Sequence, residues 1–427
     1  MKHRTFLISS LIFLISHLSF SICAAMPMQV QTDRTWYLAG EALTVSVTAD
    51  DALIAYAELC DTHGLAAGVV MSLTGGRGTG IIELPSTLHS GYYQLSVYTR
   101  HDVQVTHRLV AVVNPLSKSA DDDIEWVKVN HPDSLSYPAV VSSSQASGFI
   151  SNYHSSFFKL QTTRETEGHI ITARIKNVYG GHAYSGNQIR ASLSIIGKHI
   201  HYFEGKMIND STAVFYTYGI HGRLPLVLSA RTSTGISLPV GLVSPFAGIL
   251  PNQLPRLVFH YNRPEMERRS LDMQRMARSR EQEARSEGLG TELLEYDETV
   301  LGSKPDLSYN LDEYRQFLTV REVLLEYVSC VKKTTRQGVS QLIVRKEHEL
   351  YNNALSTLVL IDGMPVFDTD RLLNYDARRI HYINIYGGLY TFGQGTWQGI
   401  LSFVTRSGRL TNYPTESDMQ YLEYVFP

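Results

Sequence analysis

Apolar and polar residues alternate in short runs after the N-terminal segment of the chain. Alternation of this kind, broken every few residues by Gly, Pro, Asn or Asp, is typical of strands that bury one face. The clearest runs predict strands at residues 43–48, 54–59, 80–85, 92–98 and 109–113. Strands this short and this closely spaced predict a β-sandwich over residues 26–115.

A second β region follows a segment rich in Ser and Asp. That segment, residues 116–148, predicts a linker. Beyond it, a second sandwich is expected over residues 149–250, with strands at 170–175, 190–195, 213–217 and 224–229. Two sandwiches in tandem predict a rod.

Residues 251–308 predict a charged helical connector. Arg alternates with Glu and Asp between Pro264, which suits a helix start, and Gly288, which suits a stop. The apolar stripe is thin and consists of Met266, Met273, Ala277 and Ala284. Two interpretations stay open: an exposed connector, or a helix that lies across a partner.

Residues 309–410 predict a small α+β domain. A helix is expected between residues 311 and 331, where Thr319 and Glu322 fit a capping box. Strands at 358–361 and 366–367 flank Asp362 and Gly363, a pair suited to a two-residue turn, with Asp362 capping backbone amides. A short helix at 369–374 and strands at 380–385 and 399–405 complete the domain, and residues 411–427 are expected as a C-terminal tail.

This last domain resembles a known family. Asp362, Gly363 and Pro365 stand in an apolar strand that runs into an "IDG-x-P" turn, and Gly399 and Thr405 belong to a "GGI-x-x-T"-like strand. These pieces resemble the plug domain of TonB-dependent outer-membrane receptors, in which the plug fills a large β-barrel. The sequence ends soon after Thr405, at residue 427. The resemblance therefore implies a plug-like domain without a barrel, which cannot transport by itself.

The N-terminal sandwich carries a second resemblance. Tyr37, Gly40 and Glu41 form a "Tyr-x-x-Gly-Glu" run before a strand, and Gly91 and Tyr92 begin another strand. The region resembles the macroglobulin-type (MG2) module of α2-macroglobulins and of many Bacteroidota envelope proteins. The "Cys-x-Glu-Gln" thioester of true α2-macroglobulins is absent, so covalent protease trapping is excluded. The whole chain resembles a Bacteroidota exported protein: macroglobulin-like modules followed by a barrel-less plug-like domain.

The first 25 residues predict a signal peptide. Lys2 and Arg4 precede an apolar run at residues 6–20, and small residues follow at Cys23 to Ala25. Lipid attachment at Cys23 is an alternative, but Ile22 stands where a small residue is needed. We expect a protein of the periplasm or the periplasmic face of the outer membrane, with the cell surface as a further location.

Composition adds little beyond this. No segment after the signal peptide reaches the roughly 20 apolar residues of a membrane helix. The net charge of -3 gives no argument for nucleic acid as a partner. A bond between Cys60 and Cys330 is left open.

The candidate motifs for chemistry all fail. His348 and Glu349 begin like a zinc motif, but Asn352 occupies the place of the second histidine. The glycine-dense run at 76–80 lies between strands and predicts a hairpin turn, not a phosphate loop. No catalytic residue, cofactor or metal is predicted.

Two sequence features indicate surface roles. The aromatic residues Tyr382, Tyr386, Tyr390 and Trp397 predict either a recognition surface or ordinary core. Ser134 and Ser211 follow aspartates in the short pattern used for periplasmic O-glycosylation in Bacteroidota.

Taken as a whole, the sequence predicts a mainly β chain: two tandem β-sandwich (macroglobulin/Ig-like) modules, a helical connector and a small α+β plug-like domain. The preferred hypothesis is a non-enzymatic envelope scaffold or accessory protein that binds an outer-membrane or periplasmic protein. One alternative is a component of TonB-dependent nutrient uptake that docks with a separate barrel. Another is a surface adhesin or structural protein.

Overall fold

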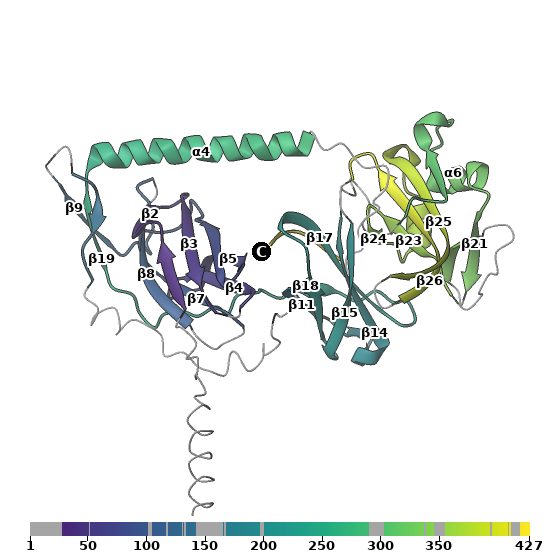
Figure 1. Ribbon diagram of the computed structural model, residues 1–427, viewed down its shortest axis with the longest axis horizontal. Coiled ribbons are helices and arrows are strands. Elements are labelled where there is room, and N and C mark those ends of the chain that lie inside the picture. The colour runs from purple at the N-terminus through teal and green to yellow at the C-terminus, as the bar shows by residue number, and fades with distance from the viewer. Residues whose placement is uncertain are drawn as a thin grey trace, which may run out of the picture.

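The computed structural model confirms a mainly β protein. Figure 1 shows three bodies in a row: a first β-domain, a second β-domain and an inserted domain, with the helix α4 running along the first β-domain toward the second. The predicted signal peptide, Cys23 included, lies outside the described residues. The described residues are 28–50, 52–100, 105–116, 118–129, 131, 134–141, 165, 168–196, 200–289, 303–336, 339–345, 355–392, 395–408, 410 and 419–427.

The first β-domain is a sandwich of two sheets. One sheet has the order β1 (Gln29–Thr32), β3 (Ala42–Thr48), β6 (Arg77–Glu83). The other has the order β2 (Trp36–Leu38), β8 (Val105–Val113), β7 (Gly91–Tyr98), β4 (Ile54–Cys60), β5 (Leu65–Ser72). Alternate residues such as Leu43, Val45 and Ile82 are buried between the sheets. Gly75 and Gly76, at φ values of 57° and 75°, form the turn that joins β5 to β6.

The second β-domain is a seven-stranded sheet that wraps around one core. Its order is β18 (Val240–Leu242), β11 (His169–Ile175), β16 (Thr212–Thr217), β15 (His201–Asn209), β14 (Ile189–Ile195), β17 (Gly222–Thr232), β27 (Gln420–Phe426). Leu193, Phe215 and Leu228 belong to the core. The two edge strands meet, because Leu242 N in β18 donates to Gln420 Oε1 in β27 over 2.5 Å.

The C-terminal residues therefore differ from the expected tail. Strand β27 pairs antiparallel with β17 from Gly222 opposite Phe426 to Leu228 opposite Gln420. Tyr424 and Phe426 are buried in the core of the second β-domain. The boundaries expected at residues 250 and 410 do not hold, since the second β-domain is closed by the end of the chain. The domain between α4 and β27 is an insertion into it.

The expected linker at 116–148 also contributes strands. β9 (Ile124–Lys128) pairs in parallel with β19 (Leu257–Tyr261), and β10 (Tyr137–Pro138) pairs with the other edge of β19. Trp126 packs edge-on against Phe259, with ring centroids 5.8 Å apart. The sequence did not predict this sheet because its strands are short and its partners lie more than a hundred residues apart.

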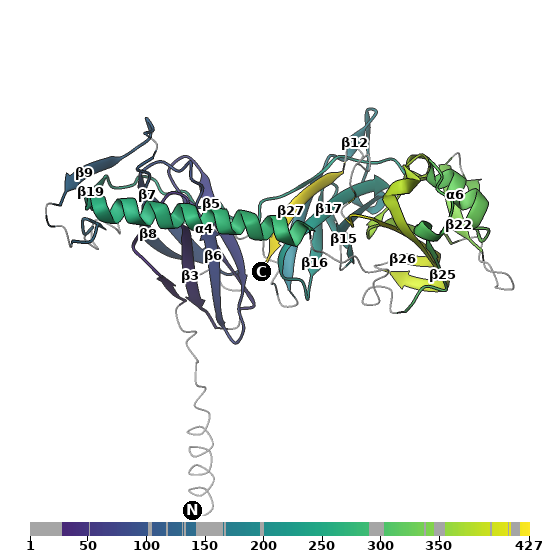
Figure 2. The ribbon, with the colours of Figure 1, turned by 90° about the horizontal axis from the view of Figure 1, so that it is seen from above.

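The helix α4 (Arg263–Leu289) begins directly after β19. Its first turns lie against the first β-domain, as Figures 1 and 2 both show, and Met266 is buried in an apolar cluster with Trp36. Further along the helix, Leu271 and Met276 are exposed. The interpretation as a fully exposed connector is therefore wrong for the N-terminal part of the helix, which packs on the chain's own first domain. Among the described residues, no helix is both long enough and apolar enough to span a membrane.

The inserted domain combines a five-stranded sheet with two short helices. The sheet order is β20 (Leu307–Asn310), β25 (Ile380–Phe392), β26 (Gly395–Thr405), β23 (Leu358–Ile361), β24 (Met364–Pro365). A separate hairpin, β21 (Val331–Arg336) with β22 (Val339–Val344), packs beside α6 (Val320–Tyr327) and α7 (Thr369–Leu373).

The first helix of the inserted domain is shorter than expected. Residues Leu311–Glu313 form a separate 3-10 turn, and α6 starts only after Thr319. Thr319 and Glu322 make the reciprocal bonds of a capping box, which fix this start. The helix therefore begins at its strongest local signal.

Candidate binding cleft and interdomain junctions

The Tyr-x-x-Gly-Glu run is the docking point of α4. Glu41 accepts a hydrogen bond from Leu38 N (2.9 Å) and forms an ion pair with Arg269 of α4 (2.6 Å). Gly40 has a φ of 94°, and a Cβ there would lie 2.9 Å from Met273 Sδ. Tyr37 is buried, and its hydroxyl donates to Asp33 Oδ1 (2.6 Å). These residues act by holding a helix that is remote in sequence.

Gly91 and Tyr92 open strand β7, and both are buried. The Tyr92 hydroxyl donates to Ala139 O over 3.2 Å, which ties β7 to the segment after β10. These two residues, predicted as part of a motif, therefore serve packing between segments.

The Asp362–Gly363 turn ties three parts of the inserted domain together. Asp362 and Gly363 have φ values of 46° and 88° and join β23 to β24, which ends at Pro365. The Asp362 carboxylate accepts from Thr405 N (2.7 Å), Thr405 Oγ1 (2.5 Å) and Leu410 N (3.0 Å). Burial raises the pKa of Asp362, and this effect outweighs the hydrogen bonds from Thr405 and Leu410, which lower it. Gly399, at φ 81°, lies in β26 against Val344.

The proposed modification sites and the cysteines lie apart from these motifs. Ser211 is in the turn between β15 and β16, where its hydroxyl donates to Asn209 Oδ1 (3.3 Å), and Ser134 is half-buried in the turn before β10. O-glycosylation at either serine stays a prediction. Cys60 is buried in β4 and Cys330 is half-buried in the inserted domain, and both thiols are free.

A buried ionic cluster joins the first and second β-domains. Arg100 donates to Glu165 Oε1 over 3.1 Å, and both side chains are at most 5% exposed. Tyr56 donates to the same Glu165 oxygen (2.6 Å), and His169 Nδ1 lies 3.1 Å from it. On its other side His169 Nε2 lies 2.6 Å from the hydroxyl of Tyr424 in β27.

The charge state of this cluster follows from its contacts. Burial alone would raise the pKa of Glu165, but the hydrogen bond from His169 and the charge of Arg100 outweigh it, so the pKa of Glu165 is lowered. Burial and the Glu165 charge raise the pKa of Tyr56 well above its ordinary value. Glu165 is therefore a carboxylate, with Arg100 as its counter-ion.

A returning segment closes the same junction. After β18 the chain crosses back over the first β-domain, where Gly248 N (2.9 Å) and Ile249 N (2.6 Å) donate to the buried carboxylate of Glu58. Arg100 donates to Pro245 O (3.2 Å). Gly68 is needed beneath this segment, because a Cβ there would lie 2.7 Å from the ring of Phe246. Burial raises the pKa of Glu58.

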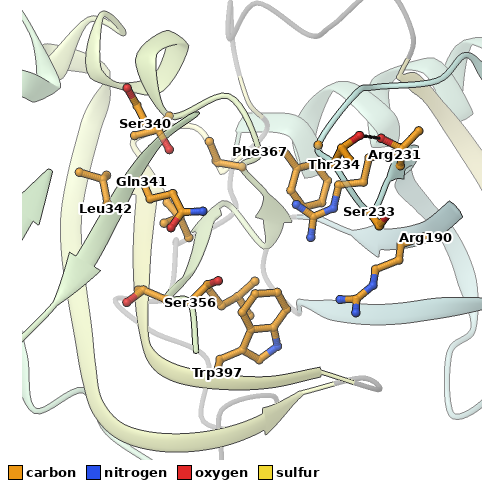
Figure 3. A pocket seen from close by; sticks show the side chains of 17 residues that line it. Arg190, Arg231, Ser233, Thr234, Ser340, Gln341, Leu342, Ser356, Phe367 and Trp397 are labelled. Carbon is orange, nitrogen blue, oxygen red and sulfur yellow. Dashed lines mark hydrogen bonds between the residues drawn. The ribbon is translucent and has the colours of Figure 1, made fainter. Parts of the chain in front are cut away.

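A cleft of about 320 Å³ lies between the second β-domain and the inserted domain. Figure 3 shows Arg190 and Arg231 reaching into it from the second β-domain, with Trp397 and Gln341 on the wall made by the inserted domain. The guanidinium of Arg231 stacks 3.7 Å from the ring centroid of Phe367. Both arginines lie on the outer face of the sheet, directly opposite one another on β14 and β17.

Sequence reasoning singled out Trp397 but not the two arginines. Of the aromatic residues named as a recognition surface or core, Tyr386 is core and Trp397 lines the cleft. The alternation of polar and apolar residues in their strands could have predicted that Arg190 and Arg231 are on the polar face. It could not have predicted that the two arginines lie opposite one another in the sheet. Across the described residues, no three His, Cys, Asp or Glu side chains are placed to hold a metal ion.

Comparisons with known proteins find no matching family and only distant structural matches. No protein-family model matches the chain, and no curated protein matches it. Among solved structures, the BSP domain of a biofilm-associated protein is 10% identical and has a TM-score of 0.18, covering 53% of this chain and 30% of that one. Native Escherichia coli α2-macroglobulin is 10% identical at a TM-score of 0.19, covering 52% of this chain and 14% of that one.

Methylamine-reacted Salmonella α2-macroglobulin is similar at the same level. It is 12% identical with a TM-score of 0.19, covering 51% of this chain and 15% of that one. This chain thus spans less than a third of each of these three structures. Likeness at these TM-scores carries no argument about fold or function.

Proposed function

We propose that the chain is an exported, non-enzymatic scaffold of the cell envelope that binds another outer-membrane or periplasmic protein. The observation that carries this proposal is the coupling of three domains into one unit. The Arg100–Glu165 pair, at most 5% exposed, locks the first junction. Strand β27 returns the chain to the second β-domain after the inserted domain. Surfaces on the three domains are thereby held at set positions.

The helix α4 adds a further brace. Arg269 pairs with Glu41 and also stacks on Trp36, 3.6 Å from the ring centroid. Burial of Met266 and close contact of Met273 with Gly40 fix the same stretch. A brace of this kind suits a protein that presents surfaces rather than one that opens and closes.

Uptake with a separate barrel is the weaker candidate. Gly363 of the plug-like turn packs on Ile200 of the second β-domain, and Ile196 and Val227 of that domain belong to the inserted domain's core cluster. The inserted domain is also attached at both ends. Entering a barrel would require breaking these contacts.

Site-directed photo-crosslinking in intact envelopes tests the scaffold role. A photoreactive residue is introduced at exposed apolar positions of the first β-domain, of α4 and of the inserted domain: Ile81, Met276, Leu325 or Leu389. We expect discrete adducts with an envelope protein from at least one position. Glu165→Ala disrupts the junction between the first and second β-domains. We therefore expect this substitution to lower the yield of adducts in which the first β-domain and the inserted domain are both cross-linked to the same partner. Absence of any adduct from all four positions would overturn the proposal.

A further inference from the structure

The cleft between the second β-domain and the inserted domain has a one-sided charge. Two arginines line it, and none of its 17 lining residues is acidic. Its other polar side chains are neutral: hydroxyls such as those of Ser233, Thr234 and Ser356, the amide of Gln341 and the indole of Trp397. Its volume of about 320 Å³ lies near the lower end of the range of small-molecule sites.

The two arginines are placed at a cost to folding. Arg190 and Arg231 are directly opposite one another in the antiparallel ladder, where like charges destabilise a sheet. Burial and the neighbouring Arg190 charge both lower the pKa of Arg231. Among the described residues, no carboxylate lies within ion-pair distance of either guanidinium. The charge of Glu204 on the neighbouring strand β15 raises the pKa of Arg231 and partly opposes this lowering.

One of the two arginine heads is held in place by an aromatic ring. Arg231 is stacked on Phe367, which fixes the plane of its guanidinium and leaves the edge donors available. Figure 3 shows the Arg190 head directed toward the space in front of Trp397. A planar anion in this space would be approached by two guanidinium groups, the arrangement that favours bidentate recognition of carboxylates.

The remaining groups distinguish between types of anion. In the turn after β17, Ser233 N already donates to Gln188 O (2.7 Å) and Gly235 N to Thr232 O (3.0 Å). The turn therefore does not offer these amides as the backbone nest that phosphate sites commonly use. Trp397 offers an indole, and the hydroxyls and amide around it match a ligand with several hydroxyl groups on a ring.

We propose that this cleft binds a short acidic saccharide. Its carboxylate lies between Arg190 and Arg231, and its sugar ring lies against Trp397. The hydroxyl groups of the ring exchange hydrogen bonds with Ser356, Gln341 and the Ser233–Thr234 turn. The site is separate from the protein-binding surfaces of the scaffold role and does not depend on it.

Calorimetric titration of the full mature chain tests the proposal. The probes are trigalacturonate, trimannuronate and a hyaluronan tetrasaccharide, with maltotriose as the neutral counterpart. We expect at least one acidic probe to bind with a Kd below about 1 mM, and maltotriose to bind at least about 10-fold more weakly. Inorganic phosphate and an acetylated peptide with a free C-terminus are the competing anions.

Variants locate the binding. Arg190→Gln and Trp397→Phe should each weaken the best probe by about 10-fold or more, since one removes a charge-assisted contact and the other changes the ring surface. Arg174→Gln is the matched control, because Arg174 is an exposed arginine on β11 of the same sheet that does not line the cleft. The affinity of the Arg174→Gln variant for the best probe should be unchanged. Ser356→Ala, a milder change, should weaken binding without affecting folding.

Four results would overturn the proposal. The first is a lack of binding by all three acidic probes at about 5 mM. The second is binding that Arg190→Gln and Arg174→Gln affect equally. The third is that inorganic phosphate binds more tightly than every acidic saccharide. The fourth is that the acetylated peptide binds more tightly than every acidic saccharide.

Discussion

Arginine has opposite roles at the two junctions of this chain, the one between the first and second β-domains and the one between the second β-domain and the inserted domain. At the first, Arg100 is buried and meets Glu165 Oε1 (3.1 Å), Ile170 O (3.3 Å) and Pro245 O (3.2 Å). At the second, Arg190 and Arg231 face a cleft with no acidic residue among the described residues that line it. A guanidinium that donates to a carboxylate and to main-chain carbonyls inside an interface holds the domains together. A guanidinium left beside a cleft is available to a ligand.

The junctions also differ in what closes them. The first uses polar atoms that are buried in pairs, including Glu58 with the amides of Gly248 and Ile249. The second uses apolar contact and shape, with Val227 in the inserted domain's core cluster and Gly363 pressed against Ile200. Electrostatic substitutions should therefore damage the first junction, and steric substitutions the second.

Glu165→Ala should have the largest effect. It leaves Arg100 buried without its counter-charge, and removal of one partner from a buried pair costs about 3–5 kcal/mol. The measurement is urea unfolding followed by circular dichroism. The control is Glu267→Ala, which removes an exposed ion pair with Arg263 and should cost less than about 1 kcal/mol. Equal costs for the two variants would contradict the comparison.

Gly363→Ala should follow. The new Cβ would lie 2.2 Å from Ile200 Cγ2 at a φ of 88°, so steric overlap adds to backbone strain. Together these cost about 2–4 kcal/mol. Gly219→Ala is matched for strain alone, because its φ is 67° and no atom lies within 4 Å of the added Cβ. The measurement is thermal unfolding. An equal fall in Tm for the two variants would show that the side chain of Ile200 is not the obstacle.

Two buried carboxylates should respond to pH in opposite directions. The pKa of Glu165 is lowered from the ordinary 4.5, so its contribution to stability is present above that value and is lost as pH falls through the lower folded pKa. The pKa of Asp362 is raised from 3.8, so its contribution is full below that value and is lost as pH rises through the higher folded pKa.

The substitutions Glu165→Gln and Asp362→Asn make this difference measurable. Asp362→Asn should cost only about 1 kcal/mol at pH 7, since Asn tolerates the positive φ and one acceptor is lost. Urea unfolding between pH 7 and pH 3 should show the cost of Glu165→Gln shrinking and that of Asp362→Asn growing on acidification. Parallel trends would contradict the assignment of Arg100 as the counter-ion that distinguishes the two sites.

Arg190→Gln should have the smallest effect on stability. The side chain is exposed and removal of a like-charge neighbour of Arg231 offsets any lost packing, so the free energy of unfolding should change by less than about 0.5 kcal/mol. Arg100→Gln, measured beside it by urea unfolding, should be strongly destabilising. A loss above about 1 kcal/mol for Arg190→Gln would mean that Arg190 serves the fold rather than a ligand.

Much of the local structure could be predicted because its signals lie in contiguous residues. Period-two alternation predicted the main strands of both β-domains. The Asp362–Gly363 pair predicted a turn with two positive φ values, and Thr319 with Glu322 predicted a helix start. The weaker strands were missed: β5 begins with Leu, Ala, Ala and Gly and has only two β-branched residues, and β2 has only three residues in all.

The candidate site could not be predicted in the same way. Arg190, Arg231 and Trp397 are ordinary residues of three strands, and only the packing of the inserted domain on the second β-domain makes them neighbours. The first junction is similar, since Glu165 lies 109 residues from Tyr56 and His169 lies 255 residues from Tyr424. No local pattern specifies such partners.

The sequence by itself therefore determined the class of the fold, the positions of its strongest strands and turns, and the charged helix. Only the tertiary structure decided that β27 closes the second β-domain, that α4 braces the first, and which arginines are paired. The physical reason is range. Backbone preference and side-chain periodicity act over a few residues, whereas burial, ion pairing and clefts depend on which distant segments pack together.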